Sequence, residues 1–350
     1  MSSKPIDISI IIPVLNESAD LPELFRNLAC QQGVVFEVIC CDGSSNDGSP
    51  ELLRELGRQV PFSSRVVAAP RGRGRQMNAG AATACGELLL FLHADSRFDD
   101  PHALLSALTT HRTTAVAENV ASRFRLRFRR TDSRPSPAYF YYESKARLNR
   151  ADCIRGDQGF LLSRRYFDRL GGFDCSLPYL EDVRLAAAVE RAGRWQLLPA
   201  VLSTSARRFE TEGIFERQVI NAIITAAVAA EWNELLEAMP GLYRSSCSSS
   251  RLQLFPLLDG IRLLIAGHDR SWRRHFWQST GRHVAGNAWQ LFYWLDVRRA
   301  FRSGAGDVEP RWYRFYQRHL ISLFESTAAG LPGQLLTKIW FRCMLVMTRS

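Results

Sequence analysis

Lysine is scarce in this 350-residue chain, and no long apolar run occurs in it. Only Lys4, Lys145 and Lys338 are lysines among 45 basic residues, so the formal net charge of +10 rests almost entirely on arginine. Arginine binds phosphate through a two-pronged fork, so an anionic substrate, an anionic membrane surface and nucleic acid all remain open. A bias toward arginine codons would give the same composition. No apolar run reaches the roughly 18 residues that a membrane span needs, which argues against a spanning helix.

Metal-binding cysteine patterns are also missing. The eight cysteines form no Cys-x-x-Cys pair, and no two histidines are spaced His-x-x-x-His, so we expect no structural zinc site. The polar start MSSKPID leads directly into an apolar segment without the features of a signal peptide. These absences predict a cytoplasmic protein.

Repeated apolar segments dominate the first 95 or so residues of the chain. Each is followed by a polar loop and then by a helical pattern, which predicts a parallel, doubly wound α/β sheet. We expect Pro13 to end the first strand. The segments are ISIIIPVLNE (8–17), FEVICCDGSSNDGS (36–49), RVVAAP (65–70) and GELLLFLHADS (86–96).

The pattern changes in the middle of the chain. SRFRLRFRR (122–130) alternates strictly between arginines and apolar residues, which predicts a half-exposed antiparallel strand with a solvated arginine face. From about residue 214 the pattern is mostly helical and rich in Trp, Phe and Arg. We therefore expect an α/β domain over 1–213 and a helical extension over 214–350.

Aromatic and basic residues alternate in the helical extension. SWRRHFWQSTGRH (271–283) and RWYRFYQRHL (311–320) are compatible with amphipathic helices on a membrane surface, and so with peripheral contact at the inner face of the membrane. NAWQLFYWLD (287–296) equally fits a helix packed against the first domain. Aromatic stripes at helical spacing usually face a core, so we favour packing.

Polar side chains follow each of the predicted parallel strands. Their carboxyl ends share one edge of the sheet, where α/β proteins bind ligands. Carboxylates beside arginines there suit a ligand with a base, a ribose and a diphosphate, together with a divalent cation. Taken alone, the DGS loop would be a turn and the HAD segment a helix cap. The polar residues at or just after the four strand ends are Asn16 with Glu17, Asp42 to Asp47, Arg71 to Arg75, and His93 with Asp95.

Five ordered motifs together resemble the family 2 glycosyltransferases with the GT-A fold. They are SIIIPVLNE, CDGSSNDGS, GRGRQMNAGAATACGELLLFLHADS, GDQGFLLSR with LGGFD, and LEDVRLAAAVERAG. The likeness covers about residues 7–210 and is greatest to the bacterial transferase 2 subgroup associated with radical-SAM and selenodomain genes. It implies a GT-A type, mostly parallel sheet with helices on both faces, followed by the helical extension.

The resemblance also implies a nucleotide-sugar half, about residues 7–100, and an acceptor half, about 101–213. Gly156, Asp157 and Gln158 match a loop that contacts the donor sugar or the acceptor, although a plain turn would explain them nearly as well. In the donor half, the resemblance implies that Pro13, Leu15 and Glu17 line the nucleotide pocket. It implies that Asp42, with Ser44 or Asp47 nearby, binds the base. Arg71 and Arg75 would contact the sugar nucleotide, with Arg75 at the diphosphate.

The metal and the general base are implied in the same way. Asp95 matches the last acid of the family's DxD motif and would bind Mg²⁺ or Mn²⁺ on the diphosphate. His93 replaces the first acid and is the expected second metal ligand. Asp182 matches the general base of inverting members, with Glu181 beside it. Without the resemblance, two acids in the first turn of a helix would be explained by the helix dipole.

The predicted function is inverting transfer of a sugar from a UDP- or GDP-sugar to a hydroxyl acceptor. Two alternatives stay open: a non-catalytic nucleotide-sugar-binding protein, and a nucleotidyltransferase acting on a sugar phosphate. The second would need a glycine-rich signature near the N-terminus, where this chain has PVLNE. No nucleic-acid-binding module is recognised, so no nucleic-acid partner is expected.

Overall fold

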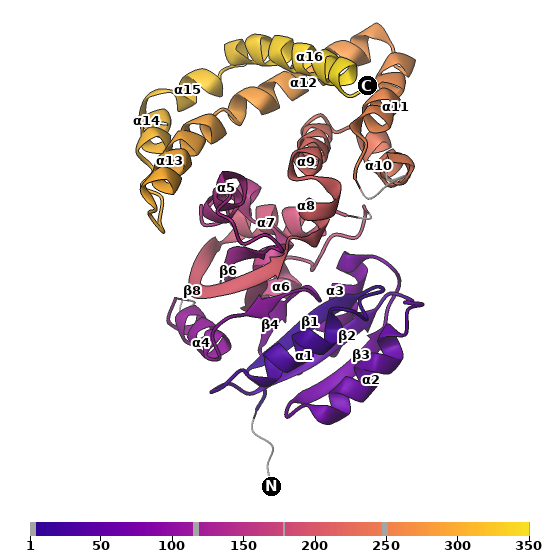
Figure 1. Ribbon diagram of the computed structural model, residues 1–350, viewed down its shortest axis with the longest axis vertical. Coiled ribbons are helices and arrows are strands. Elements are labelled where there is room, and N and C mark those ends of the chain that lie inside the picture. Colours follow the sequence, from indigo (N-terminus) through magenta and orange to yellow (C-terminus); the bar gives the residue numbers. More distant parts are fainter. Residues whose placement is uncertain (1–4, 115–118, 178, 247–250, 350) are drawn as a thin grey trace. The chain divides into compact units, whose positions relative to one another are not determined.

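The chain divides into two compact units (Figure 1). The first comprises the residues up to Arg129 together with Lys145–Ser205, and the second comprises Arg130–Ser144 and Ala206–Ser350. The structure, a computed structural model, describes residues 5–114, 119–177, 179–246 and 251–349.

The first unit is built on an eight-stranded sheet with the order β3-β2-β1-β4-β7-β6-β8-β5. Strands β3, β2, β1 and β4 are mutually parallel, as are β6 and β8, whereas β7 and β5 run antiparallel to their neighbours. The predicted mostly parallel sheet is confirmed. The strands are β1 (Ile8–Val14), β2 (Phe36–Asp42), β3 (Ser63–Ala68), β4 (Leu88–Phe91), β5 (Arg97–Phe98), β6 (Val120–Arg129), β7 (Phe160–Ser163) and β8 (Arg194–Ser205).

Helices cover both faces of this sheet, as predicted. Side chains of β1 alternate between two apolar clusters: Ile10 and Ile12 pack with α1, α2 and α4, whereas Ile11 packs with α3, α6 and α7. Both faces are buried, which explains why the central strands are mostly apolar. The helices are α1 (Leu21–Ala29), α2 (Ser49–Gln59), α3 (Arg73–Thr83), α4 (Ala103–Thr114), α6 (Arg164–Arg169) and α7 (Glu181–Ala192), with the short turns η1 (Ala151–Cys153) and η2 (Gly156–Gln158).

Pro13 does not end the first strand. Strand β1 continues to Val14, and Pro13 pairs in register with Cys41 of β2. On its other side β1 pairs with β4 only as far as Ile11 opposite Phe91. The missing N–H of proline is therefore tolerated, because β1 has only one neighbouring strand at this level.

The expected arginine face of β6 is only partly solvated. The strand alternates as predicted, but Arg123 is completely buried. Its guanidinium donates to the carbonyl oxygens of Ala146 (2.7 Å) and Leu148 (2.8 Å) and to Gln158 Oε1 (3.1 Å). The prediction was wrong at this position because alternation cannot show which carbonyl groups the fold brings to a strand.

The second unit is helical, as expected, but it also includes residues 130–144. Tyr293 Oη donates to the carbonyl oxygen of Ser144 (2.9 Å), and the Phe140 ring centroid lies 5.7 Å from that of Phe301. No helix in the described ranges is both long and apolar enough to cross a membrane. The remaining helices are α5 (Pro137–Lys145), α8 (Arg207–Glu212), α9 (Ile214–Ala229), α10 (Asn233–Ser246), α11 (Leu254–Gly267), α12 (Arg270–Gly286), α13 (Trp289–Ser303), α14 (Arg311–His319), α15 (Ile321–Phe324), η3 (Thr327–Ala329) and α16 (Gly330–Met347).

Candidate active site

The loops after β1 and β2 are tied together by hydrogen bonds. The Asn16 N–H donates to Ser45 Oγ (2.9 Å), and Asn46 N–H donates to Asn16 Oδ1 (2.9 Å). Asn16 and Ser44 both take left-handed backbone angles, which short polar residues tolerate. The two loops therefore form one rigid rim at the carboxyl edge of the sheet, next to Pro13 and Leu15.

Asp42 and Asp47, the two acids of the second loop, both accept hydrogen bonds within this rim. Asp42, at the end of β2, accepts the N–H groups of Ser44 (3.0 Å) and Ser45 (3.2 Å) at Oδ2. Asp47 accepts the N–H of Ser18 (3.0 Å) and the N–H and hydroxyl of Ser49. Burial raises the pKa of Asp47, but these hydrogen bonds outweigh it and lower the pKa. Asp47 therefore has a structural role in the loop, whatever else it contacts.

Gln76 holds this edge of the sheet together, and the sequence analysis missed it. Its buried Nε2 donates to the carbonyl oxygens of Val14 (2.7 Å) and Cys41 (2.7 Å), the ends of two adjacent strands. The one hint in the sequence was the side-chain amide of Gln76 among the small residues of a helix. The sequence could not show its hydrogen-bond partners, because Val14 and Cys41 lie far from it along the chain.

Of the three arginines at residues 71–75, around the start of α3, the middle one contacts the predicted catalytic residue Glu181. Arg73 Nε lies 2.6 Å from Glu181 Oε1, and the Glu181 side chain is 3% exposed. A Cβ on Gly74 would stand 3.2 Å from the Glu181 Cβ, so glycine allows this close approach. Arg71 and Arg75, which the resemblance selected, are exposed and make no hydrogen bond or ion pair in the described part of the chain.

Asp182 is held as an ionised carboxylate in the first turn of α7. Leu180, directly before this helix, takes a left-handed conformation that is uncommon for a bulky residue. The Asp182 Oδ2 accepts the N–H of Gly156 (2.9 Å), and Oδ1 accepts the N–H of Val183 (2.9 Å). Burial opposes ionisation, but Arg73 and these hydrogen bonds outweigh it and lower the pKa of Asp182.

His93 lies beside this carboxylate. A Cβ built on Gly156 would stand 3.2 Å from His93 Nε2 and 3.5 Å from Asp182 Oδ2. The side chains of His93 and Asp182 therefore approach each other next to this glycine. A small cavity opens here, and it is lined by Met77, Phe91, His93, Gly156, Phe160, Phe173, Glu181 and Asp182.

Asp157 forms a second carboxyl group next to Asp182. Burial, followed by the negative charge of Asp182, raises the pKa of Asp157 to about 7, and Asp95 adds to the rise. Its Oδ1 is buried and has no hydrogen-bond partner. When neighbouring carboxyl groups have pKa values that are driven apart, one holds a proton while the other stays ionised. Here Asp182 is the ionised group, whereas Asp157 keeps its proton until the pH approaches 7.

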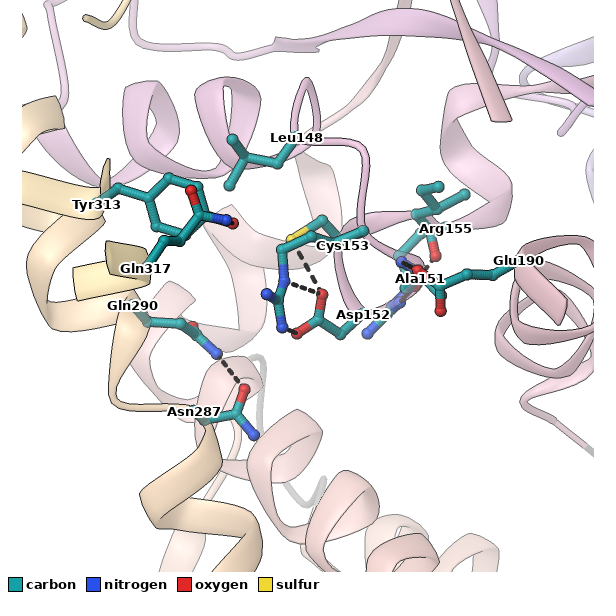
Figure 2. A network of polar contacts seen from close by, with 12 residues as sticks. Leu148, Ala151, Asp152, Cys153, Arg155, Glu190, Asn287, Gln290, Tyr313 and Gln317 are labelled. Atoms are coloured by element: carbon teal, nitrogen blue, oxygen red, sulfur yellow. Dashed lines mark hydrogen bonds and ion pairs between the residues drawn. The ribbon is translucent and has the colours of Figure 1, made fainter. Parts of the chain in front are cut away.

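The segment before Asp157 is braced by polar contacts (Figure 2). Asp152 accepts two hydrogen bonds from the guanidinium of Arg150, at 2.9 Å and 3.0 Å, and Glu190 accepts the N–H of Ala151 (3.2 Å). Arg155 bonds back to the Ile154 carbonyl oxygen (2.7 Å). The positive charge of Arg155 lowers the pKa of both Asp157 and Asp182, a role the sequence did not indicate.

Asp95 follows β4 in a loop fixed on several sides. Its Oδ2 accepts the Thr204 hydroxyl (3.1 Å) and the N–H of Ser205 (3.2 Å), and its carbonyl oxygen accepts Arg129 (2.6 Å). Arg97 donates to two further carbonyl oxygens of the loop. The carboxylate is therefore held in one position.

The donor set at Asp95 fits a divalent cation shared with a ligand. Asp95 Oδ1 makes no hydrogen bond within the described ranges, and Asp157 Oδ1 is a buried oxygen without a partner. Mg²⁺ prefers oxygen ligands and is usually held by one or two carboxylates together with substrate phosphates. Among the described residues, no three His, Cys, Asp or Glu side chains surround a common point.

The structure brings together some of the predicted residues and not others. The charges of Asp95 and Asp182 both act on Asp157, and both raise its pKa. Asp42 and Arg75 make no hydrogen bond or ion pair with that group in the described part of the chain. Gln158 is buried, with Oε1 bonded to Arg123 (3.1 Å) and Nε2 bonded to the Cys153 carbonyl oxygen (2.9 Å), so it positions the loop.

The raised pKa of Asp157 gives a prediction for stability. The unfolded chain deprotonates this group near pH 4 and the folded chain near pH 7, so the residue destabilises the metal-free fold increasingly as pH rises between these values. We expect Asp157→Asn to raise the free energy of unfolding by roughly 1–3 kcal/mol near pH 8 and to change it little near pH 4.

Urea denaturation at both pH values measures this difference. Asp168→Asn, an exposed carboxylate on α6, is the matched control and should change neither value. A gain of equal size at both pH values would show that Asp157 is not the group responsible.

Part of the first unit is similar to a known protein family. Residues 9–171 match the family model described as Glycosyl transferase family 2. Over 101 residues the chain is 38% identical to Undecaprenyl-phosphate 4-deoxy-4-formamido-L-arabinose transferase of Pseudomonas paraeruginosa, covering 27% of this chain and 30% of that protein. Over 106 residues it is 32% identical to 4,4'-diaponeurosporenoate glycosyltransferase of Staphylococcus haemolyticus, covering 30% of this chain and 28% of that protein. The chain thus spans less than a third of the length of either relative.

Solved structures match over a longer part of the chain. Residues 1–349 of S. aureus TarS, crystallised in complex with UDP, align with a TM-score of 0.50 and 17% identity, covering 85% of this chain and 92% of that one. At this identity the likeness concerns the fold, and it agrees with the predicted GT-A architecture. Residues 9–171 are therefore similar to glycosyl transferase family 2, and the fold that contains them is of the GT-A type.

Proposed function

We propose that the chain transfers a sugar from a nucleoside diphosphate sugar to an acceptor hydroxyl with inversion at the anomeric carbon. The observation that carries this proposal is the ionised Asp182, fixed by the Gly156 N–H at the cavity. The family 2 domain supports sugar transfer, and both relatives named above are transferases of sugars by their names.

Asp182 is proposed as the general base. One carboxylate oxygen accepts the proton of the acceptor hydroxyl while the hydroxyl oxygen forms its bond to the anomeric carbon. The bond from that carbon to the diphosphate oxygen breaks on the opposite face, so configuration inverts. A positioned base of this kind contributes about 10²–10⁴-fold to the rate.

The neighbours of Asp182 tune this step. Arg73 keeps Asp182 ionised and is itself held by the buried Glu181. Glu181 is thus proposed to position Arg73 rather than to act as a base. The pKa of Asp157 is raised to about 7, so below that pH it adds no second negative charge next to the base.

Asp95 is proposed to hold Mg²⁺ or Mn²⁺, with Asp157, on which the charge of Asp95 acts, as a second oxygen donor. When bound, the cation neutralises charge that develops on the diphosphate oxygens. His93 was predicted as a second ligand, but its Nε2 lies at Gly156 and Asp182, where it is better placed to orient the acceptor or the base.

The rim formed by the first two loops is the proposed donor site. Pro13, Leu15 and Glu17 would border the nucleotide, and Asp42 would bind the base through lone pairs not used within its loop. Ser44 and Asp47 shape that loop. The exposed Arg71 and Arg75 are free to bind the diphosphate. UDP and GDP are the candidate nucleotides.

The acceptor half and the finer subgroup remain proposals. Gly156, Asp157 and Gln158 would border the acceptor, and the division into halves at about residue 100 follows the resemblance alone. The same holds for the radical-SAM and selenodomain-associated subgroup, for cytoplasmic localisation, and for a domain boundary near residue 213.

A thermal-shift panel tests the proposal. UDP, GDP and other nucleoside diphosphates are added with and without Mn²⁺, because a ligand that binds only the native state stabilises it. We expect one nucleotide to raise the melting temperature in the presence of Mn²⁺, by the equivalent of about 2.7 kcal/mol at a hundredfold excess over Kd.

Product analysis separates the alternatives. Slow release of the nucleoside diphosphate from its sugar conjugate indicates a glycosyltransferase. Binding without release would indicate the non-catalytic binder, and pyrophosphate formed from a nucleoside triphosphate and a sugar phosphate would indicate a nucleotidyltransferase. A panel in which no nucleotide stabilises the protein would overturn the proposal.

A further inference from the structure

Helix α16 in the second unit presents large apolar side chains to solvent. Six of them lie on its exposed side, 50–74% exposed, and we call them the apolar face of α16: Leu331, Leu335, Leu336, Ile339, Val346 and Met347. Trp340 and Cys343 are exposed on the same helix. A helix of a globular protein normally turns such a stripe toward the core. An apolar patch of this length marks an interaction site.

The buried side of α16 explains why the apolar face is outward. The helix lies along α12 (Figure 1). Gly333 packs against the backbone at Gly281, and a side chain on either glycine would overlap the facing helix. Small residues thus hold α16 in contact with α12. The bulky residues occupy the remaining side, and the docking of α16 fixes them there.

The chain segment that contains this face is strongly cationic. Residues 270–349 contain 13 arginine or lysine residues and four aspartate or glutamate residues. Of these acids, Asp296 is buried and accepts the N–H groups of Trp312 and Tyr313 at the start of α14, and Glu309 pairs with Arg311. Arg342 is the one charged side chain on the exposed side of α16 in the described ranges.

Exposed aromatic residues accompany the cations. Trp312 is 49% and Phe315 is 45% exposed on α14, and Trp294 on α13 is 43% exposed beneath the guanidinium of Arg298, 5.1 Å from the ring centroid. Tryptophan and arginine are favoured where lipid headgroups meet acyl chains, because each has an apolar body and a polar end.

We propose that the apolar face of α16 inserts into the surface of an anionic phospholipid bilayer, with the helix lying in the plane of the membrane. Charge complementarity selects this partner over a second copy of the chain, because self-association would bring two sets of arginines together. No described helix can span a bilayer, so the proposed contact is with one leaflet. This inference is independent of the proposed sugar transfer.

Vesicle co-sedimentation of the full chain tests the proposal. The vesicles are phosphatidylcholine alone or phosphatidylcholine with a quarter of phosphatidylglycerol. We expect binding to the anionic vesicles to be about tenfold tighter or more and to weaken at high salt. Leu335→Glu should lower the partition coefficient by about tenfold or more.

Phe215→Glu on α9 is the matched control, because Phe215 is 56% exposed and the charge change is the same. It should bind vesicles nearly as the wild type does. Circular dichroism checks that each variant folds, and Ile339→Glu replaces Leu335→Glu if the latter does not. Equal binding by Leu335→Glu and the wild type, or no binding of the wild type to either vesicle, would overturn the proposal. A wild-type dimer that Leu335→Glu abolishes, with no vesicle binding, would also overturn it and identify a second copy as the partner.

Discussion

Asp182→Asn is expected to lower the rate of sugar transfer by about 10²–10⁴-fold while leaving donor affinity within a few-fold of the wild type. Asparagine keeps the size of the side chain and can still accept the Gly156 N–H through its amide oxygen. It cannot take the proton of an acceptor hydroxyl. The loss should therefore appear in kcat, because a base acts in the transition state and contributes little to donor binding.

The measurement is release of nucleoside diphosphate in the presence of acceptor, together with calorimetric binding of the donor. Asp168→Asn makes the same chemical change on the exposed surface of α6 and should leave both values unaltered. A loss in donor affinity as large as the loss in rate would mean that Asp182 binds the donor and that the base is another residue.

Asp95→Asn is the second change with a large expected effect. It should weaken donor binding in the presence of Mn²⁺ by about 10- to 100-fold or more, since changes to groups that merely support a metal ligand already cost that much. The amide can still accept from Thr204 or Ser205, so the loop after β4 should keep its position. Binding without metal should be almost unchanged.

Donor titrations with Mn²⁺ and with a chelator separate these effects. Asp99→Asn is the control, because Asp99 is exposed and pairs with Arg127 at the surface, at 2.8 Å. If Asp95→Asn bound the donor with Mn²⁺ as tightly as the wild type, Asp95 would not be the metal ligand.

Local patterns in the sequence were sufficient to predict the sheet. The strands β1, β2 and β4 are mostly apolar because helices cover both faces, and that pattern can be read from each segment alone. Local patterns also predicted that Asp95 follows a strand and that Glu181 and Asp182 lie at the start of a helix.

Contacts between distant segments could not be predicted. Arg71, Arg73 and Arg75 alternate with glycines and look equivalent in sequence, yet only Arg73 reaches Glu181, because α3 starts there and Gly74 packs on α7. The partners of Gln76 and Arg123 are carbonyl oxygens far along the chain. Single-sequence reasoning contains no information about such pairs.

The stereochemistry of donor hydrolysis tests the central claim most directly. The claim is that Asp182 serves as a base for direct displacement of the diphosphate by an acceptor or by water. Proton NMR of the sugar first released from an α-linked donor, recorded before mutarotation, should then show the β-anomer. Initial release of the α-anomer would show retention of configuration, and it would contradict a mechanism in which Asp182 deprotonates the attacking group in a single displacement.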